Sequence, residues 1–238
     1  APDVVGLQEC DGPTAAVLAG TLRMEAVHDE EGNAILSRHP VVDVVGRTAD
    51  PWGGLGVTIA RRGQRVHVFD AHLHYTTYGP HSLQDGRAPA IILKDEDTTR
   101  MPGLRELLSL MADALASGEP TFLVGDFNAP SHLDYADFPW PTSIACAEHG
   151  LEDSYRAVHP AARLWPPGFR FDEPGVTWTP RVEEEARGTF DRIDFVFHSA
   201  SGGTVATSSF TLDSLASGEP WPSDHRAVLS TFRLVARA

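Results

Sequence analysis

The chain has 238 residues, of which 42% are hydrophobic, and this suits one large α/β domain or two small ones. No apolar run approaches the ~20 residues of a membrane span, so we expect no transmembrane segment. The formal net charge is −14, and such a surface should repel a polyanion unless a local basic strip compensates. Cys10 and Cys146 are too few for a disulfide framework, so the compartment stays open between cytoplasmic and secreted.

The first third of the chain reads as short strands around one helix. Residues 4–7 form an apolar run that predicts a strand, and Glu9 follows it almost at once. A glutamate at the end of a buried strand is costly unless it is paired, binds a metal or reaches solvent. A helix is predicted next and then three strands, at residues 14–22, 33–38, 41–46 and 54–60.

Residues 65–74 alternate with period two and place His72 and His74 on one face at the end of a strand. Residues 75–101 are polar with little periodicity. They favour a long loop that serves as a lid or binding loop, the alternative being a solvated insertion with no role. Apolar residues at helical spacing then predict a helix over residues 104–116.

The stretch from Thr121 to Pro130 is the most informative in the chain. It begins as a β-branched apolar run and ends in Gly125-Asp126-Phe127-Asn128. Asp126 and Asn128 are two apart, so they point the same way from an extended strand end. A carboxylate and a carboxamide there suit a hard cation and an oxygen nucleophile, and the alternative is a turn after a core strand.

The remainder adds a short helix, several strands and loops without any linker that would divide the chain. The helix is predicted at residues 144–149, the strands at 176–179, 190–197, 204–212 and 226–234, and a loop at 160–174. We therefore predict a single domain over residues 1–238, with two packed sheets and helices outside.

Seven polar residues end or interrupt these apolar runs: Glu9, His72, Asp126, Asn128, Asp194, Asp224 and His225. Oxygen donors of this kind suit Mg²⁺, and two histidines suit proton transfer or the stabilisation of an oxyanion. The chain has no Gly-x-Ser-x-Gly elbow and no glycine-rich phosphate loop. Metal-assisted hydrolysis is the reaction class that uses all seven residues.

The chain resembles the endonuclease/exonuclease/phosphatase superfamily, whose fold is that of deoxyribonuclease I. The matching motifs, in order, are Leu7-Gln8-Glu9, Asn33-Ala34-Ile35-Leu36-Ser37-Arg38, Ala71-His72-Leu73, Gly125-Asp126-Phe127-Asn128, Arg192-Ile193-Asp194-Phe195 and Ser223-Asp224-His225. The resemblance spans nearly the whole chain. It implies a four-layer α/β sandwich, with two mixed β-sheets face to face and helices on both outer sides.

The resemblance also implies a role for each polar residue. Glu9 would be the main metal ligand, with Asp224 near the same cation, while Asp126 and Asn128 would orient the attacking water and a phosphate oxygen. His225 would be the catalytic histidine, either base or stabilising cation, oriented by Asp194. His72 would contact the scissile phosphate. These seven are the predicted metal ligands and catalytic residues.

One departure from the family pattern concerns the start of the chain. The family normally places a strand ending in Asn, and then a helix, before the Gln-Glu strand, but here Ala1-Pro2-Asp3 directly precedes it. Since an unpaired edge would remain beside the site, we predict roughly 25–40 further residues upstream in the natural protein. The alternative is that another chain or a later segment fills the gap.

The resulting expectation is a Mg²⁺-dependent phosphoesterase, with Mn²⁺ or Ca²⁺ as alternatives, acting on a small molecule or lipid headgroup. Substrate contacts are expected from Asn33, Arg38, Tyr75 and Tyr78, and residues 75–101 should overhang the phosphate site. The charge disfavours nucleic acid as a partner, although a nuclease or DNA-repair enzyme is the alternative within the same fold. A non-catalytic binding domain is the alternative of another class. The sequence makes no prediction of oligomeric state.

Overall fold

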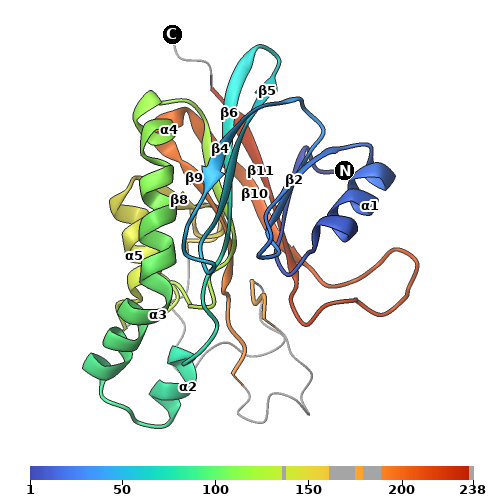
Figure 1. Ribbon diagram of the computed structural model, residues 1–238. Helices are drawn as coiled ribbons and strands as arrows, with labels where there is room; N and C mark the ends of the chain where they lie inside the picture. Colours follow the sequence, from blue (N-terminus) through green and yellow to red (C-terminus); the bar gives the residue numbers. More distant parts are fainter. Residues whose placement is uncertain (136–137, 161–174, 179–188, 236–238) are drawn as a thin grey trace.

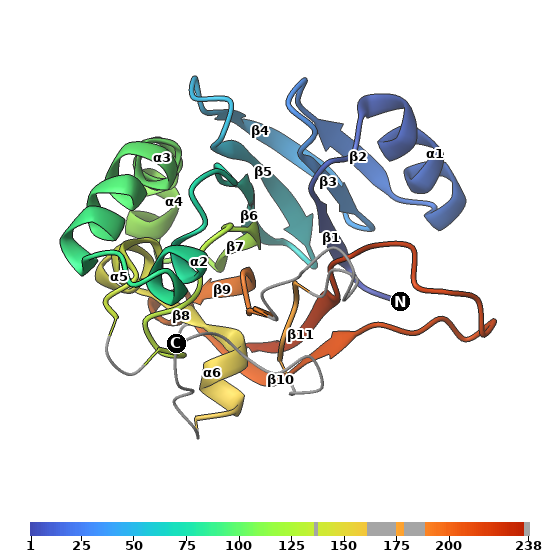
Figure 2. The same ribbon diagram turned by 90° about the horizontal axis from the view of Figure 1, so that it is seen from below.

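The computed structural model describes residues 1–135, 138–160, 175–178 and 189–235. They form stacked layers, with a large mixed sheet against two smaller sheets and helices on the outer sides (Figures 1 and 2). The expected four-layer α/β arrangement is therefore confirmed. Most of the loop predicted at residues 160–174, and the end of the strand predicted at 176–179, fall outside the described residues.

The described part of the large sheet has six strands in the order β4-β5-β6-β7-β9-β8. Their bounds are Val41–Arg47 (β4), Gly54–Arg61 (β5), Gln64–His72 (β6), Thr121–Asp126 (β7), Asp194–Ser199 (β9) and Leu151–Asp153 (β8). Among the described strands of this sheet, only the β6–β7 pair is parallel. The carboxyl ends of β6 and β7 therefore meet at one edge, where the predicted polar residues follow.

The opposing layer consists of two separate antiparallel sheets among the described residues. One has the order β1-β3-β2, with bounds Val4–Leu7, Ala34–Ser37 and Glu25–His28, and the other pairs β10 (Thr204–Leu212) with β11 (Ala227–Leu234). β1 pairs only with β3 among the described strands. Pairing of β1 on both sides would have contradicted the expected upstream strand, which therefore stays a prediction.

Helices cover both outer sides of the sheets. Three of them, α3 (Pro89–Leu110), α4 (Ala112–Ser117) and α5 (Pro141–Glu148), lie on the outer face of the large sheet (Figure 1). On the other side α1 (Gly12–Leu22) covers the β1-β3-β2 sheet, and α6 (Ser154–Val158) packs on β10 (Figure 2). The remaining short elements are α2 (Gly79–Gln84) and the 3₁₀ turn Ala200–Gly202.

The two largest apolar clusters among the described residues hold these layers together. Between the sheets, Ile35 of β3 packs on β5 and β6 side chains such as Val57 and Val68. Beneath the outer helices, Phe69 of β6 packs with Leu104 and its neighbours on α3. The central strands are thus buried on both faces, which explains their near-continuous apolar runs.

Residues 75–101 depart from the sequence expectation, because most of them are helical. α2 and α3 occupy 79–84 and 89–110, so the predicted long loop is wrong, and the helix predicted from residue 104 begins at Pro89. Pro102-Gly103 reads as a helix start, but α3 continues through Pro102. The strands β2 and β8 were not predicted; they are only 4 and 3 residues long. No helix among the described residues is both long and apolar enough to span a membrane.

Candidate active site

Three of the predicted residues lie in one row across adjacent strands of the large sheet. His72 at the end of β6 is the register partner of Asp126 on β7, and Asp126 is the register partner of Asp194 on β9. The His72 Nε2 atom lies 3.9 Å from Asp126 Oδ2. Residues that are 54 and 68 positions apart in the chain are therefore neighbours because the strand order places their ends side by side.

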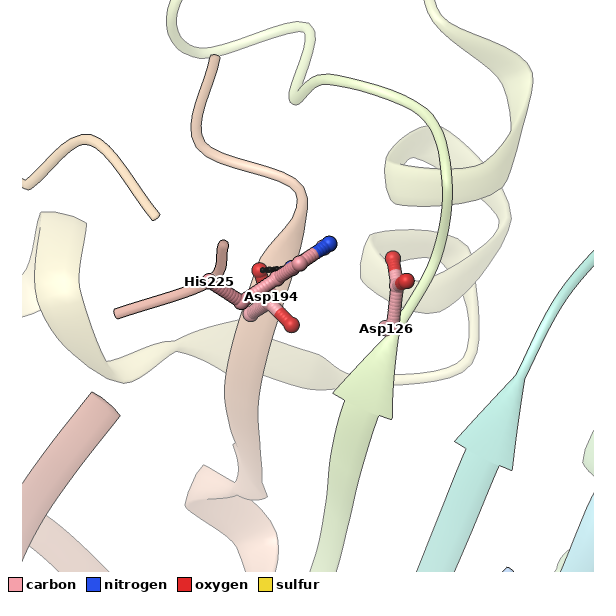
Figure 3. A group of neighbouring side chains, drawn as sticks. All are labelled: Asp126, Asp194 and His225. Atoms are coloured by element: carbon pink, nitrogen blue, oxygen red, sulfur yellow. Dashed lines mark hydrogen bonds and ion pairs between the residues drawn. The ribbon is translucent and has the colours of Figure 1, made fainter. Parts of the chain in front are cut away.

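His225 joins this row from the loop before β11. Its Nδ1 atom lies 2.8 Å from Asp194 Oδ2, and the dashed line of Figure 3 marks this contact. In the same view the Asp126 carboxylate lies beside the pair. The expected contact between Asp194 and His225 is confirmed, and it leaves the Nε2 atom of His225 for other partners.

Glu9 reaches the row from the opposite sheet layer. It follows β1, and its Oε1 atom lies 4.0 Å from His72 Nε2, while the side chain is 84% exposed. Glu9 has a φ of 54°, an uncommon conformation for a residue other than glycine. Since its side chain is exposed, the Glu9 carboxylate is open to a ligand from solvent.

Asn128 is fixed to the same edge by three hydrogen bonds. Its backbone N–H donates to Asp126 Oδ1 at 2.7 Å, and its side-chain Nδ2 donates to Asp126 Oδ2 at 3.2 Å and to the Leu73 carbonyl at 2.9 Å. Asn128 also has a positive φ, of 49°. The pair predicted from the Gly-Asp-Phe-Asn motif is thus one hydrogen-bonded unit, with the Asn128 side-chain oxygen not used in these bonds.

Thr177 and Trp178 connect Asp194 with His225. Thr177 Oγ1 accepts the backbone N–H groups of Ile193 and Asp194, each at 3.0 Å. Trp178 forms isolated β-bridges with both Asp191 and His225. The sequence predicted a strand here, and the described residues form bridges that hold the two catalytic candidates in register.

Burial and neighbouring carboxylates shift the pKa values of several residues in the site. Burial and the Asp194 carboxylate raise the pKa of Asp126 to about 8. Burial opposes charge on His225, but Asp194, Asp126 and Asp224 outweigh it and raise the pKa of His225 to about 10. Burial lowers the pKa of His72 despite the nearby Glu9 carboxylate. Protons on Asp126 and His225 thus offset the negative charge of the site at neutral pH.

The residues fit a divalent cation by their donor chemistry. Asp126, Asp194 and His225 each offer a ligand atom, and these atoms lie within 4.8 Å of one another. Glu9 adds an exposed carboxylate near His72. Asp224 is exposed, and its charge acts on His225. Carboxylate oxygens are the donors that Mg²⁺ prefers, and a cation would replace the proton that Asp126 otherwise holds.

The four predicted substrate contacts have different positions. Asn33 lies at the Glu9 end of β3, where it is buried and donates from Nδ2 to Asp29 Oδ2 at 2.8 Å. Arg38 lies at the opposite end of β3, where its Nε donates to the Pro2 carbonyl, so the antiparallel register separates it from Glu9. Tyr75 is 58% exposed near His72. Tyr78 donates its hydroxyl to Asp191 Oδ2 at 2.6 Å, which makes it part of the structure behind the site.

Arg192 of the matched Arg-Ile-Asp-Phe motif is a buried structural residue. Its guanidinium bonds Asp134 and Asp153, and its Cζ lies 4.6 Å from the centroid of the Phe195 ring. These contacts tie β9 to β8 and to the loop after β7. Arg192 therefore supports Asp194 from behind and does not face the site.

Sequence reasoning missed a buried carboxyl behind Glu9. Asp70 on β6 is fully buried, and its Oδ1 accepts from Gln8 Nε2 at 2.6 Å. Burial raises the pKa of Asp70 well above its ordinary value. Gly6 makes room for it, since a Cβ there would lie 2.5 Å from Asp70 Oδ1. The one available signal was that Asp70 and His72, two apart, share a face of the strand.

Asp29 and Asp191 are two further supports that the sequence did not indicate. Asp29 Oδ1 accepts the backbone N–H groups of Glu31 and Asn33 and so shapes the turn beside Glu9. Asp191 accepts the hydroxyls of Tyr78 and Tyr135, both at 2.6 Å. The partners of Asp29 are only two and four residues away, whereas those of Asp191 are 113 and 56 residues away, so no sequence spacing reveals Asp191.

A basic cluster does exist, but it lies far from the site. Arg61, Arg62 and Arg65 line a cavity of about 630 Å³ at the β5–β6 hairpin. β6 begins there and ends at His72, so the cluster and the site occupy opposite ends of the sheet. These arginines are a local basic cluster, but no basic track leads from it into the site among the described residues.

Comparisons with known proteins agree with this fold. The model of the endonuclease/exonuclease/phosphatase family matches residues 1–225, and the chain belongs to this family. It is similar to the uncharacterized protein F14F9.5 of Caenorhabditis elegans, 29% identical over 270 residues that cover 98% of this chain and 82% of that protein.

Solved structures show the same fold at low sequence identity. Truncated TDP2 from Caenorhabditis elegans superposes with a TM-score of 0.65 and 17% identity, covering 97% of this chain and 84% of that one. The human Nocturnin catalytic domain with bound sulfate superposes with a TM-score of 0.64 and 18% identity, covering 98% of this chain and 82% of that one. The 3′ phosphatase NExo from Neisseria, bound to a product DNA hairpin, superposes with a TM-score of 0.62 and 21% identity, covering 98% of this chain and 89% of that one.

Proposed function

We propose that the protein is a Mg²⁺-dependent phosphoesterase that hydrolyses a small-molecule or lipid-headgroup phosphoester. The observation that carries this proposal is the row His72–Asp126–Asp194, with His225 bonded to Asp194 and Glu9 facing His72. Acids and histidines gathered at one edge of a sheet provide cation ligands and donors for a phosphoryl group. Family membership supports the same reaction class.

In this proposal Glu9 and Asp224 bind the cation, with the Asp126–Asp194 carboxylates close by. When bound, the cation would supply positive charge where negative charge grows on the phosphoryl oxygens. The carboxylate oxygens of the site favour Mg²⁺, and Mn²⁺ or Ca²⁺ are alternatives with the same preference for oxygen ligands. Binding should release a proton from Asp126, because its pKa of about 8 keeps that proton at neutral pH.

The other residues would position the reactants. Asp126 would hold and orient the attacking water, and the Asn128 amide, fixed by its bonds to Asp126, would bind a phosphate oxygen. His225, oriented by Asp194 through Nδ1, would present Nε2 to the phosphoryl group, and His72 would contact it from the other side.

Charge favours a small substrate over a long nucleic acid. The chain has a formal net charge of −14, and the arginine cluster at the β5–β6 hairpin lies at the opposite end of the sheet from the site. A duplex binder needs cations along the backbone path that leads into the site. The second candidate is a nuclease or DNA-repair enzyme. It is favoured by one observation, that the similar NExo structure holds a product DNA hairpin.

A side-by-side assay separates the two candidates. Duplex DNA, RNA and a panel of small phosphomono- and phosphodiesters are tested with Mg²⁺, for the natural chain and for His225→Ala. His149→Ala, which changes an exposed histidine at the carboxyl end of α5, is the matched control. We expect turnover of at least one small ester, lost in His225→Ala and kept in the control. Efficient cleavage of duplex DNA with little turnover of any small ester would favour the nuclease.

A further inference from the structure

An aromatic cluster beside His72 belongs to none of the catalytic roles above. Trp52, on the loop between β4 and β5, lies edge-on to the His72 ring with centroids 5.6 Å apart. The Trp52 ring is also 4.8 Å from His74 and 5.4 Å from Tyr75, and the His74 and Tyr75 rings are stacked at 5.6 Å. We call Trp52, His74 and Tyr75 the aromatic platform.

The platform is open to solvent although its members are mostly apolar. Tyr75 is 58% exposed, and Trp52 and His74 are half-buried. Isolated exposed apolar residues are ordinary, but contiguous rings next to a candidate catalytic histidine are typical of a ligand site. A π-face binds any planar ring without reading its hydrogen-bond pattern.

The platform is held rigidly in place by α3. Arg100 is fully buried and donates to the carbonyls of Tyr75 and Asn128, so one side chain fixes both the platform and the catalytic candidate Asn128. Gly103 permits close contact with the Trp52 backbone, since a Cβ there would lie 1.9 Å from its carbonyl oxygen. The backbone N–H of Trp52 also donates to Asp50 Oδ1 at 2.9 Å. A preordered surface loses little conformational entropy when a ring binds.

Resting on the proposed function, we propose that the aromatic platform binds a planar ring in the substrate, so that the enzyme prefers phosphoesters bearing an aryl group or a nucleobase over simple alkyl esters. The phosphoryl group would lie at His72, and Trp52 touches His72 directly, so a ring attached to the phosphate reaches the platform without a long spacer. The shared chemistry is a phosphate with a nearby planar ring. It is met by aryl phosphates and by single nucleotides.

Binding of phosphonates tests this without requiring turnover, because their P–C bond is not hydrolysed. With Mg²⁺ present, calorimetry compares phenylphosphonate with methylphosphonate, which share the anionic group and differ in the ring. We expect phenylphosphonate to bind the natural chain roughly tenfold more tightly, a difference typical of one stacked ring. The 5′-methylenephosphonate analogue of thymidine 5′-monophosphate, which is likewise not hydrolysed, is measured in the same way. Tighter binding than methylphosphonate supports recognition of a nucleobase, and equal affinity contradicts that part of the proposal.

Variants of Tyr75 isolate the ring itself. Tyr75→Phe keeps the ring and should keep the preference, whereas Tyr75→Ala and the apolar but non-planar Tyr75→Leu should reduce it to about twofold or less. Methylphosphonate binding reports whether each variant keeps its anion site. Equal affinity of the natural chain for the two phosphonates, or a preference that survives in Tyr75→Ala, would overturn the platform. Loss of hydrolysis of every ester, with the ring preference intact, would overturn the proposed function alone.

Discussion

The Asp194–His225 contact is the best-defined polar interaction of the site at the scale of single residues. Asp194 accepts from His225 Nδ1 at 2.8 Å, and this bond selects one tautomer and one ring orientation. Thr177 in turn accepts the Asp194 N–H, so the carboxylate has little freedom. Thr177 thus positions Asp194, and Asp194 positions His225, so a substitution of Asp194 should act by changing His225.

Asp194→Asn should therefore cost most of the activity that His225→Ala loses, on the order of 10²-fold or more. The same change removes the main charge that raises the pKa of His225, so that pKa should fall from about 10. The measurement is the rate on a small phosphodiester together with an NMR titration of the histidine ring. An unchanged His225 titration in Asp194→Asn would contradict the assignment, whatever the rate.

Asp70 provides a test of stability against pH. Its folded-state pKa lies well above the unfolded value, so it contributes stability that is present at low pH and is lost as the pH rises above about 4. Asp70→Asn keeps the shape but cannot ionise. We expect the variant to be at least as stable as the natural chain at neutral pH, with a gain that shrinks towards pH 4.

Thermal unfolding across this pH range makes the comparison, with the exposed Asp43→Asn on β4 as the matched control. A pH-independent difference between the natural chain and Asp70→Asn would mean that the Asp70 carboxyl titrates normally. The bond to Gln8 also predicts that the variant retains activity, since an amide oxygen can accept from Gln8 Nε2 as the carboxyl does.

At the scale of elements, α3 does more than cover the sheet. Its buried Arg100 donates to the carbonyls of Asn128, Tyr75 and Thr77, and Glu96 one turn earlier forms an ion pair with Arg100 at 3.2 Å. Burial raises the pKa of Glu96 to about 7 even though Arg100 opposes this. The helix thereby fixes two loops that border the site.

Arg100→Met should destabilise the fold by about 3 kcal/mol, because it leaves Glu96 and several carbonyls without their buried donor. Chemical denaturation measures the loss, and Arg105→Met, an exposed arginine one turn and a residue further along α3, is the control. A loss of under about 1 kcal/mol would show that water or neighbouring groups replace the guanidinium. Deletion of residues 75–101, in contrast, would remove core side chains such as Ile92 and is not an informative variant.

The strands were predictable where a short apolar run carries its own signal in the sequence. Strand ends marked by polar residues gave β1, β6, β7 and β9, and with them the positions of Glu9, His72, Asp126 and Asp194. The sequence did not reveal α2 and most of α3, because polar and charged residues there hide the helical periodicity and Pro102-Gly103 imitates a helix start. The 4-residue β2 and the 3-residue β8 depend on tertiary pairing with β3 and β9.

At the scale of the whole molecule, the site depends on the meeting of two sheet layers. Glu9 comes from the small sheet, and the row His72–Asp126–Asp194 comes from the large one. Motif order indicated that these residues belong together, but supports such as Asp70, Asp191 and Arg100 act across layers. Their partners are distant in the chain, so spacing alone could not identify them. The remote position of the arginine cluster likewise emerges only from strand direction.

Titration of the chelator-treated protein with Mg²⁺ tests metal-dependent hydrolysis at this site most directly. Thermal unfolding and hydrolysis of a chromogenic phosphodiester are followed together, for the natural chain, for Glu9→Gln and for Glu148→Gln, an exposed glutamate on α5. We expect Mg²⁺ to restore activity and to raise Tm in the natural chain and in Glu148→Gln, more at pH 8 than at pH 6, because the cation displaces the proton of Asp126. Glu9→Gln should stay folded and lose at least about 10²-fold in rate. Near-normal, Mg²⁺-dependent turnover in Glu9→Gln, or hydrolysis by the natural chain that needs no cation, would contradict this site.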